Sequence, residues 1–270
     1  MADDKVSIGN VDILSLSDGI GERQATELFP NVPATDLGRY SDIVSPEGTL
    51  TYKYGSFVLH SQGETILVDT GMGPNLPGSL LDELKAKRIE RDEITVVVNT
   101  HLHPDHVGWN VTWKEKQPHR TFPRARYWLP KADWQHFSQP ELLEQYVHIG
   151  RAVMPLEQLG ALELVEGERA ITTEVSLLPT PGHTPGHMSL AIVSEGQRGM
   201  ILGDVAHFPF QAQEVAWEVL FDMDKGQARR TREAMMERLE RDGSLVGAGH
   251  FSTTFGRFVR SEGRRYWQAL

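Results

Sequence analysis

The 270-residue chain contains no cysteine, and this absence excludes several kinds of chemistry. Disulfide scaffolds, thiolate nucleophiles and cysteine-ligated zinc sites are ruled out. Long apolar runs are missing too, since none approaches the roughly 18 residues that a membrane-spanning helix needs. The opening segment, MADDKVSIGN, has neither the basic start nor the apolar core of a signal peptide, so we expect a cytoplasmic protein.

Positive charge is scarce relative to negative charge. The chain has 27 Lys and Arg against 37 Asp and Glu, which gives a formal net charge of −10. Such a chain is a poor partner for phosphate backbones and anionic membranes, so we expect neither nucleic acid nor a membrane as partner. Apolar residues are plentiful at 39%, enough for a sizeable core, and this excludes a disordered chain.

Strand and helix patterns are interspersed along the chain and favour an α/β fold. Apolar or alternating runs bounded by turn residues indicate strands at 5–16, 50–60, 65–69, 94–99, 125–129, 174–178, 188–193, 200–202 and 244–248. Capping signals, an initial proline and a terminal glycine indicate helices at 79–90, 140–149 and 227–241. The stretches 21–46 and 107–124 are predicted to be long irregular loops. Because no linker divides the halves, we predict one domain over residues 1–270.

The most informative motif is HLHPDH at residues 101–106, which follows the apolar run 94–99. A strand ending there delivers its last residues into the crevice at the carboxyl end of the sheet, where α/β proteins bind ligands. Imidazole and carboxylate groups suit divalent first-row metals such as zinc. His101 and His103 can point the same way, while Asp105 and His106 turn toward a neighbouring point beyond the proline. The spacing therefore indicates two ions.

Three further polar residues, each flanked by glycine, follow apolar runs. His183 lies in the segment TPGHTPGH, Asp204 in LGD and His250 in GAGH. Glycine allows close backbone approach where a crowded site needs it. A polar loop that happens to be histidine-rich is the simpler interpretation of residues 101–106, but the agreement of these three motifs argues against it.

Together these motifs closely resemble those of the metallo-β-lactamase superfamily. The matching segments are VDTG at 68–71, HLHPDH at 101–106, PGH at 181–183, GD at 203–204 and GH at 249–250, in the family's order. The resemblance covers about residues 50–255. It implies an α/β fold of the αββα sandwich type, with two mixed β-sheets flanked by helices. It also implies two metal ions in a cleft between the sheet edges.

The resemblance implies a role for each metal-binding side chain. By motif position the ligands of the first metal are His101, His103 and His183, those of the second are Asp105, His106 and His250, and Asp204 bridges the two. Asp69 is expected to orient a ligand imidazole or to serve the turn after its strand. His187 is expected to support the turn or the sheet.

Two metals that share a water lower its pKa toward neutrality and generate hydroxide. We therefore expect hydrolysis by attack of a metal-bridging hydroxide on a carbonyl or phosphoryl centre. Asp105 would orient the nucleophile or deliver a proton to the leaving group. Zinc fits the nitrogen and oxygen ligands, and manganese, iron and cobalt are allowed by the same set.

Differences between this sequence and particular branches of the family reduce the range of substrates that we expect. No cysteine stands where some β-lactamases use one as a ligand, and the retained Asp105 and His106 differ from oxygen-reducing diiron relatives. The acidic charge, with no recognisable inserted nuclease domain, counts against the branches that cut RNA and DNA. The layout from Asp204 to His207 and at GAGH resembles the lactonase and methyl-parathion-hydrolase-like branches. Those branches act on lactones, esters and phosphotriesters.

His207 occupies the position where quorum-quenching lactonases carry a tyrosine that contacts substrate, which argues against narrow acyl-homoserine lactone specificity. Its ring could donate a hydrogen bond to a substrate oxygen, protonate a leaving alkoxide, or only support the local turn. Aromatic residues near the motifs could pack in the core or at an oligomer interface, or could line a pocket for a substrate with an apolar group. These are Trp109, Trp113, Phe208, Phe210, Trp217 and Phe221.

The function predicted from the sequence is that of a dinuclear metallohydrolase acting on a small ester or lactone. Phosphotriester hydrolysis and β-lactam hydrolysis are the alternatives among hydrolases. A metal-bound protein that has lost turnover is the alternative outside enzymes, and the complete ligand set argues against it. The same set argues against the one-iron oxidation of persulfide-dioxygenase-like relatives. A homodimer is compatible with the resemblance.

Overall fold

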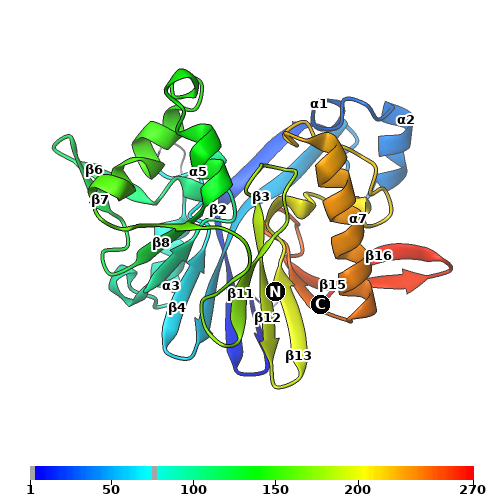
Figure 1. Cartoon of the computed structure of the whole chain (residues 1–270). Coiled ribbons are helices and arrows are strands. Elements are labelled where there is room, and N and C mark those ends of the chain that lie inside the picture. The colour runs from blue at the N-terminus through cyan, green and yellow to red at the C-terminus, as the bar shows by residue number, and fades with distance from the viewer. Residues whose placement is uncertain (1–3, 75–77) are drawn as a thin grey trace.

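The computed structural model of the chain describes residues 4–74 and 78–270, and its centre is a pair of seven-stranded β-sheets (Figure 1). The first sheet has the order β1-β2-β3-β4-β5-β8-β9 and the second β10-β11-β12-β13-β14-β15-β16. Both are mixed, because β4, β5, β8 and β9 run parallel in the first and β13 pairs parallel to β14 in the second. The start of the segment MADDKVSIGN, residues 1–3, lies outside the described residues.

The strands of the first sheet are β1 (Lys5–Ile8), β2 (Val11–Gln24), β3 (Thr49–Ser61), β4 (Glu64–Val68), β5 (Val96–Val98), β8 (Arg126–Pro130) and β9 (Leu162–Val165). Those of the second are β10 (Arg169–Ala170), β11 (Val175–Pro179), β12 (Met188–Ser194), β13 (Gln197–Ile201), β14 (Leu245–Gly247), β15 (Phe255–Ser261) and β16 (Arg264–Ala269). A small hairpin joins β6 (Val111–Lys114) to β7 (Gln117–Arg120).

The helices are short except for the last one. They are α1 (Ala25–Leu28), α2 (Ala34–Leu37), α3 (Leu80–Ala86), α4 (Pro104–Val107), α5 (Lys131–Phe137), α6 (Pro155–Gln158) and α7 (Lys225–Arg241). Helical turns complete the set: η1 (Gly38–Tyr40), η2 (Arg91–Glu93), η3 (Pro140–Leu142), η4 (Ile149–Val153), η5 (Gly203–Val205) and η6 (Pro209–Ala212). Among residues 4–74 and 78–270, no helix is both long and apolar enough to cross a bilayer.

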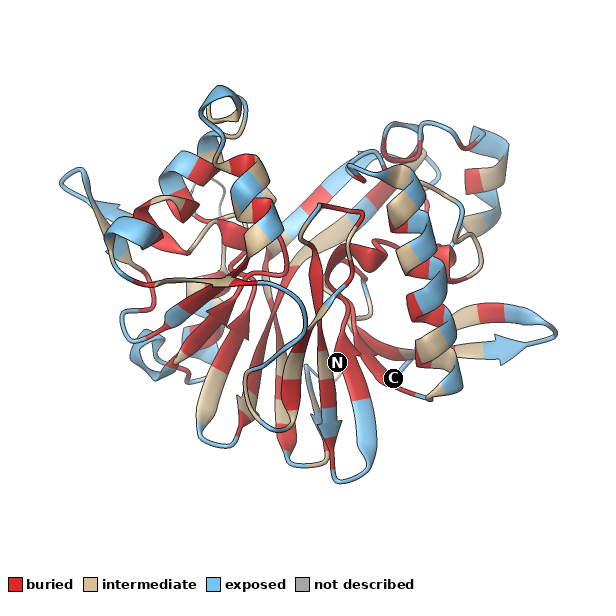
Figure 2. Ribbon diagram, in the orientation of Figure 1, coloured by how far each residue is buried: buried red, intermediate tan, exposed pale blue. Residues whose placement is uncertain are grey.

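Strand β5 shows why the chain forms layers. Val96 and Val98 belong to the apolar cluster between the two sheets, whereas Val97 points to the other face, into the cluster beneath the helices. Successive side chains of a strand alternate between faces, so a strand buried on both sides reads as a continuous apolar run. A third cluster, which includes Met236 of α7, covers the outer face of the second sheet. The predicted αββα sandwich is thereby confirmed, and Figure 2 shows the buried residues concentrated in these layers.

Several predicted elements differ in extent. The run 5–16 is broken by a turn between β1 and β2, and β2 continues to Gln24. Within 140–149 the structure has only the turn η3 before η4, so the helix predicted there is wrong. The predicted loops are also partly ordered, because 21–46 contains α1, α2 and η1, and 107–124 contains the β6–β7 hairpin. The single-domain organisation over 1–270 stays a prediction.

Helix α3 begins where predicted but is capped differently. Ser79 makes no side-chain capping bond, and its hydroxyl donates instead to the carbonyl oxygen of Ser17 at 2.8 Å. The carboxylate of Asp18, on β2, accepts from the backbone N–H of Leu80 at 2.7 Å. A long-range carboxylate thus does what the local capping-box pattern was expected to do.

Candidate metal centre

The predicted metal-binding side chains lie on segments that leave neighbouring strands at one edge of the sandwich. Residues 101–106 follow β5, with Pro104 as the first residue of α4. His183 lies in the turn between β11 and β12, Asp204 in η5 directly after β13, and His250 after β14. The turns are tight because glycine permits them. At Gly203, with φ of +59°, an added Cβ would lie 2.6 Å from Nε2 of His187.

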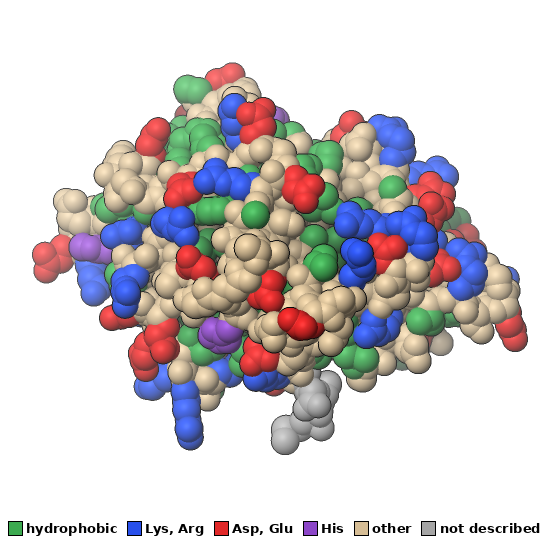
Figure 3. All heavy atoms as spheres, turned by 60° about the horizontal axis from the view of Figure 1, so that its bottom comes forward, with side chains coloured by type: hydrophobic (Ala, Val, Ile, Leu, Met, Phe, Trp, Pro, Cys, Tyr) green, Lys and Arg blue, Asp and Glu red, His purple; other side chains and the backbone are tan. Residues whose placement is uncertain are grey.

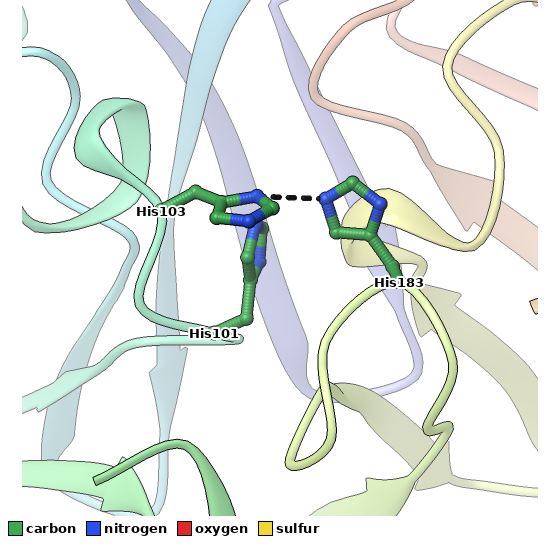
Figure 4. A group of neighbouring side chains, drawn as sticks. All are labelled: His101, His103 and His183. Atoms are coloured by element: carbon green, nitrogen blue, oxygen red, sulfur yellow. Dashed lines mark hydrogen bonds between the residues drawn. The ribbon is translucent and has the colours of Figure 1, made fainter. Parts of the chain in front are cut away.

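All seven predicted side chains come together, and His207 joins them. Four groups each offer three ligand atoms within 4.8 Å of one another. The groups are His101–His103–His183, His101–His106–Asp204, Asp105–His106–His250 and His183–Asp204–His207. Figure 4 shows the first group, in which His103 and His183 approach from opposite sides with Nδ1 and Nε2 2.9 Å apart.

Hydrogen bonds at the outer nitrogens fix how three of the imidazoles point. Nδ1 of His106 donates to Asp69 at 2.8 Å, and Nδ1 of His183 donates to Asp222 at 2.9 Å, since a carboxylate can only accept. Nδ1 of His250 donates to the carbonyl oxygen of Lys53 at 2.6 Å. In each ring Nδ1 and its proton are turned outward, so Nε2 faces the cluster. This is the usual arrangement for histidines that bind metal.

The inner nitrogens fit a divalent metal because the protein itself does not satisfy them. Nε2 of His101 and Nε2 of His106 are buried and have no hydrogen-bond partner among the described residues. These two nitrogens lie 3.8 and 3.5 Å from the nearest Asp204 oxygen. Buried, unpaired lone pairs are costly, and a cation would satisfy them together. Imidazole and carboxylate are donors that divalent first-row metals accept.

Electrostatics in the cluster favour added positive charge. Burial alone would raise the pKa of Asp204, but the neighbouring His250 and His106 outweigh it and hold that pKa well below its usual range. Burial likewise would lower the pKa of His250, but the Asp204 carboxylate outweighs burial and raises that pKa to about 9. Burial, reinforced by His106, lowers the pKa of His101 well below its usual value, which keeps that ring neutral. Asp204 is therefore an anion and His101 a neutral ring, the forms that bind metal, whereas His250 carries a proton that a bound metal would displace.

Two residues whose roles the sequence left undecided support the cluster in the structure. Asp69, directly after β4, accepts from Nδ1 of His106 and also from the backbone N–H and hydroxyl of Thr100, at 2.7 and 2.8 Å. His187 accepts the backbone N–H of Asp204 on Nε2 at 2.8 Å, while its Nδ1 donates to the carbonyl oxygen of Thr180. Asp69 orients a ring, and His187 supports the turn that carries Asp204.

Sequence reasoning missed two buried aspartates that organise this site. Asp133, in α5, accepts from the backbone N–H of Leu102 and from Thr184 and Gly186, so it ties the two histidine-bearing loops together. Asp222 accepts from His183 and also from the fully buried Arg232 of α7 at 2.9 Å. Asp133 follows the apolar run 125–129, which was a usable signal, but it has no glycine or histidine beside it, and Asp222 follows no apolar strand run.

A cavity of about 460 Å³ opens beside the cluster. His103, Asp105, His183, Asp204, His207 and His250 line its floor. Its walls are largely apolar, with Leu28, Met72, Phe208, Val219, Phe221 and Met223 among them, and Tyr52, Tyr54 and Arg23 add polar groups. An apolar cavity with a few convergent polar groups is the common form of a small-molecule site.

The aromatic residues divide between cavity and core. Phe208 and Phe221 line the cavity, as a pocket-wall role requires. The other four do not line it. Phe210 and Trp217 pack around Phe29, with ring centroids 5.3 and 6.2 Å away. Trp109 donates its Nε1 hydrogen to Asp18, and Trp113 is exposed on the β6–β7 hairpin.

Comparison with known proteins agrees with this geometry. The family model described as the metallo-beta-lactamase superfamily matches residues 55–250, the stretch that carries all seven side chains. An N-acyl homoserine lactonase of Bacillus thuringiensis is 25% identical over 189 residues, covering 62% of this chain and 68% of its own length.

Two solved structures share the fold across nearly the whole chain. AidC, described as a dizinc quorum-quenching lactonase, has a TM-score of 0.84 at 20% identity and covers 98% of this chain and 96% of its own. The hydrolase AbOPH of the beta lactamase superfamily has a TM-score of 0.86 at 22% identity, with the same coverage of both chains.

Proposed function

Because the chain belongs to the metallo-beta-lactamase superfamily, we propose that it is a metal-dependent hydrolase of small esters or lactones. The observation that carries the proposal is the convergence of seven His and Asp side chains beside an apolar cavity. The lactonase activity named for the Bacillus relative supports the ester and lactone class. The cluster suits divalent metal in general, and two zinc ions are our specific assignment.

The ligands of the two ions would be the residues that the sequence predicted. One ion would be held by His101, His103 and His183. The other ion would be held by Asp105, His106 and His250, and Asp204 would contact both ions. When bound, such ions lower the pKa of water and polarise a carbonyl oxygen. Two buried nitrogens without hydrogen-bond partners among the described residues, Nε2 of His101 and Nε2 of His106, support this assignment, because they lie 3.8 and 3.5 Å from the Asp204 carboxylate.

Asp105 and His207 are the two side chains that we place in contact with the reacting groups. The Asp105 carboxylate lines the cavity, and His106 and His250 hold its pKa low against the effect of burial, so it is an anion at neutral pH. It can orient a water molecule and pass a proton to the leaving group. Burial lowers the pKa of His207, which leaves a neutral ring with one N–H to donate to a substrate oxygen.

The cavity walls predict which esters and lactones react. Phe208, Val219 and Phe221 offer apolar surface in the cavity that His207 also lines, so we expect substrates with an acyl, aryl or alkoxy group to be preferred. A series of esters of increasing chain length tests this expectation. The value of kcat/KM should rise with chain length until the cavity of about 460 Å³ is filled. A flat series would contradict it.

The decisive experiment is an activity screen of metal-reconstituted protein. Chelator-stripped enzyme should be inactive, and zinc should restore hydrolysis of lactones or aryl esters. Manganese, iron and cobalt are compared in parallel, because the same ligands admit them. Full activity after removal of the metal ions would contradict the proposal. The panel includes phosphotriesters and cephalosporins, so that preferred cleavage of either replaces the ester assignment with that alternative.

A protein that binds metal but turns over nothing in the panel would be the non-enzyme alternative. The cytoplasmic location and the homodimer also stay predictions. Size-exclusion chromatography with light scattering tests directly whether the protein is a homodimer.

A further inference from the structure

A second cavity, separate from the one beside the candidate metal ligands, is lined by four arginines. Its volume is about 340 Å³, and its guanidinium groups come from Arg39, Arg260, Arg264 and Arg265. Arg39 lies in η1, whereas Arg260 lies in β15 and Arg264 and Arg265 open β16. On the face shown in Figure 3, Lys and Arg side chains lie on both sides among Asp and Glu, and those on the right are on the side where Figure 1 places α7 and this hairpin.

The local charge of this cavity is opposite to that of the whole chain. Glu214 lines the cavity with the four arginines, and Glu240 stands behind two of them. Counting also Asp36, which lies 3.9 Å from Arg39, four positive charges against three negative ones leave +1, in a chain whose formal net charge is −10. A concentrated positive site on an acidic protein needs a counter-charge, and a bound anion would supply it.

The carboxylate of Glu240 forms ion pairs with two of the arginines but leaves several of their N–H groups without a partner among the described residues. Glu240 accepts from Nε of Arg265 at 2.7 Å and from Nε and Nη2 of Arg260 at 2.5 and 3.1 Å. The Arg265 side chain is only 9% exposed, yet its two terminal nitrogens have no hydrogen-bond partner among residues 4–74 and 78–270. Arg264 forms no ion pair within the same residues. Several N–H groups thus remain available at the cavity.

On the opposite wall, Arg39 is similarly held. Its Nη2 lies 3.3 Å from the Glu214 carboxylate, which also accepts from the Tyr40 hydroxyl at 2.9 Å. The shared carboxylate therefore draws Arg39, whose side chain is 59% exposed, toward the cavity. Guanidinium groups gathered around a polar space match the paired oxygens of phosphate and carboxylate groups.

From this geometry we infer that the arginine cavity is a binding site for a doubly charged oxoanion, with a phosphate group as the ligand. The site is separate from the metal centre and shares no lining residue with the larger cavity. It requires no hydrolytic activity, so the inference stands or falls independently of the proposed function. The phosphate comes either as the free ion or as a monoester of a small molecule.

The test uses metal-loaded enzyme titrated with inorganic phosphate and, separately, with glycerol phosphate, in a calorimeter at constant ionic strength. The double variant Arg39→Gln/Arg264→Gln removes two cavity arginines. Its matched control, Arg126→Gln/Arg169→Gln, removes two half-exposed arginines that ion-pair with Glu163 instead. We expect saturable binding whose Kd rises at least about tenfold in the cavity variant and changes less than about twofold in the control.

Other results overturn the inference. Phosphate bound by a metal centre would inhibit ester cleavage competitively and would keep its Kd in the cavity variant. Equal weakening in both double variants would mean only general electrostatics, and an absence of saturable binding up to about 10 mM would leave no specific site. If binding is found, tighter binding of glycerol phosphate identifies a phosphorylated small molecule as the ligand, and equal binding identifies the free ion.

Discussion

Asp222 accepts the Nδ1 hydrogen of His183 at 2.9 Å, although the two residues lie 39 positions apart in the chain. Burial would raise the pKa of Asp222, but His183 and the Arg232 guanidinium outweigh burial and hold that pKa at about 2. The carboxylate is therefore ionised and keeps the His183 ring in the tautomer whose Nε2 faces the cluster. This relationship links the core of α7 to the candidate metal centre.

Asp222→Asn should weaken metal binding about 10- to 100-fold, because the amide cannot hold the His183 tautomer as a carboxylate does. The measurement is zinc affinity by competition with a chromophoric chelator, which needs no substrate. Asp242→Asn is the matched control, since that aspartate also pairs with arginines but lies on the surface. An unchanged zinc affinity in Asp222→Asn would remove its positioning role.

His207→Phe should lower kcat on the best substrate on the order of 100-fold while leaving the metal content unchanged. Both ring nitrogens of His207 are buried without hydrogen-bond partners among the described residues, and Nε2 lies 3.1 Å from an Asp204 oxygen. That position suits a donor to substrate. An unchanged kcat would assign the ring to the local turn, and loss of metal would assign it to the ligand set.

Gly55→Ala should displace His250 and with it reduce metal affinity. An added Cβ at Gly55 would lie 2.2 Å from the carbonyl oxygen of Gly249, so β3 and the turn before His250 could no longer approach. Backbone contact at that distance cannot be relieved by a side-chain rotation. Thermal unfolding and zinc titration are the measurements.

Gly38→Ala provides the control for this prediction. Gly38 has φ of −62° and no atom within 4 Å of a built Cβ, so the same substitution should leave zinc affinity and Tm within error. Equal behaviour of the two alanine variants would contradict the close-approach argument.

Glu240 makes stability depend on acid pH. Hydrogen bonds from Arg260 and Arg265, opposed by burial, lower its pKa from 4.5 to about 2. Because the folded-state pKa is the lower one, this contribution is complete above about pH 4.5 and is lost as the pH falls toward 2. Glu240→Gln should therefore cost about 1 kcal/mol in urea unfolding at pH 7, and much less near pH 2.5.

Glu233→Gln, on the exposed face of the same helix, is the reference for that measurement. It should change stability by less than about 0.5 kcal/mol at either pH. A Glu240→Gln penalty that persists unchanged at pH 2.5 would contradict the pKa argument.

Many strands of the sandwich could be predicted from local sequence patterns. The runs that became β3, β4, β5 and β12 were predicted to within two residues at each end, because their apolar character follows from burial. Strands β15 and β16 were missed, since their sequence carries arginines at many positions and shows no apolar run. Tertiary pairing, in register from Gly256↔Ala269 to Ser261↔Arg264, forms that hairpin.

The seven candidate ligands were identifiable because each stands in a short motif after an apolar strand. Their supporting contacts were not, since Asp133 and Asp222 reach the segments that carry the histidines across separations of 31 to 53 residues. The capping pattern at residues 79–82 shows the same limit, because Asp18 took the role that Ser79 was expected to play.

The sequence alone determined which residues could bind metal and which runs would be buried, because ligand motifs and strand alternation both depend on residues that are close together in the chain. The tertiary structure decided which nitrogen of each imidazole faces inward, which aromatics line the cavity, and that four arginines meet around one space. Those outcomes depend on contacts between distant segments, which form only when the two sheets pack together.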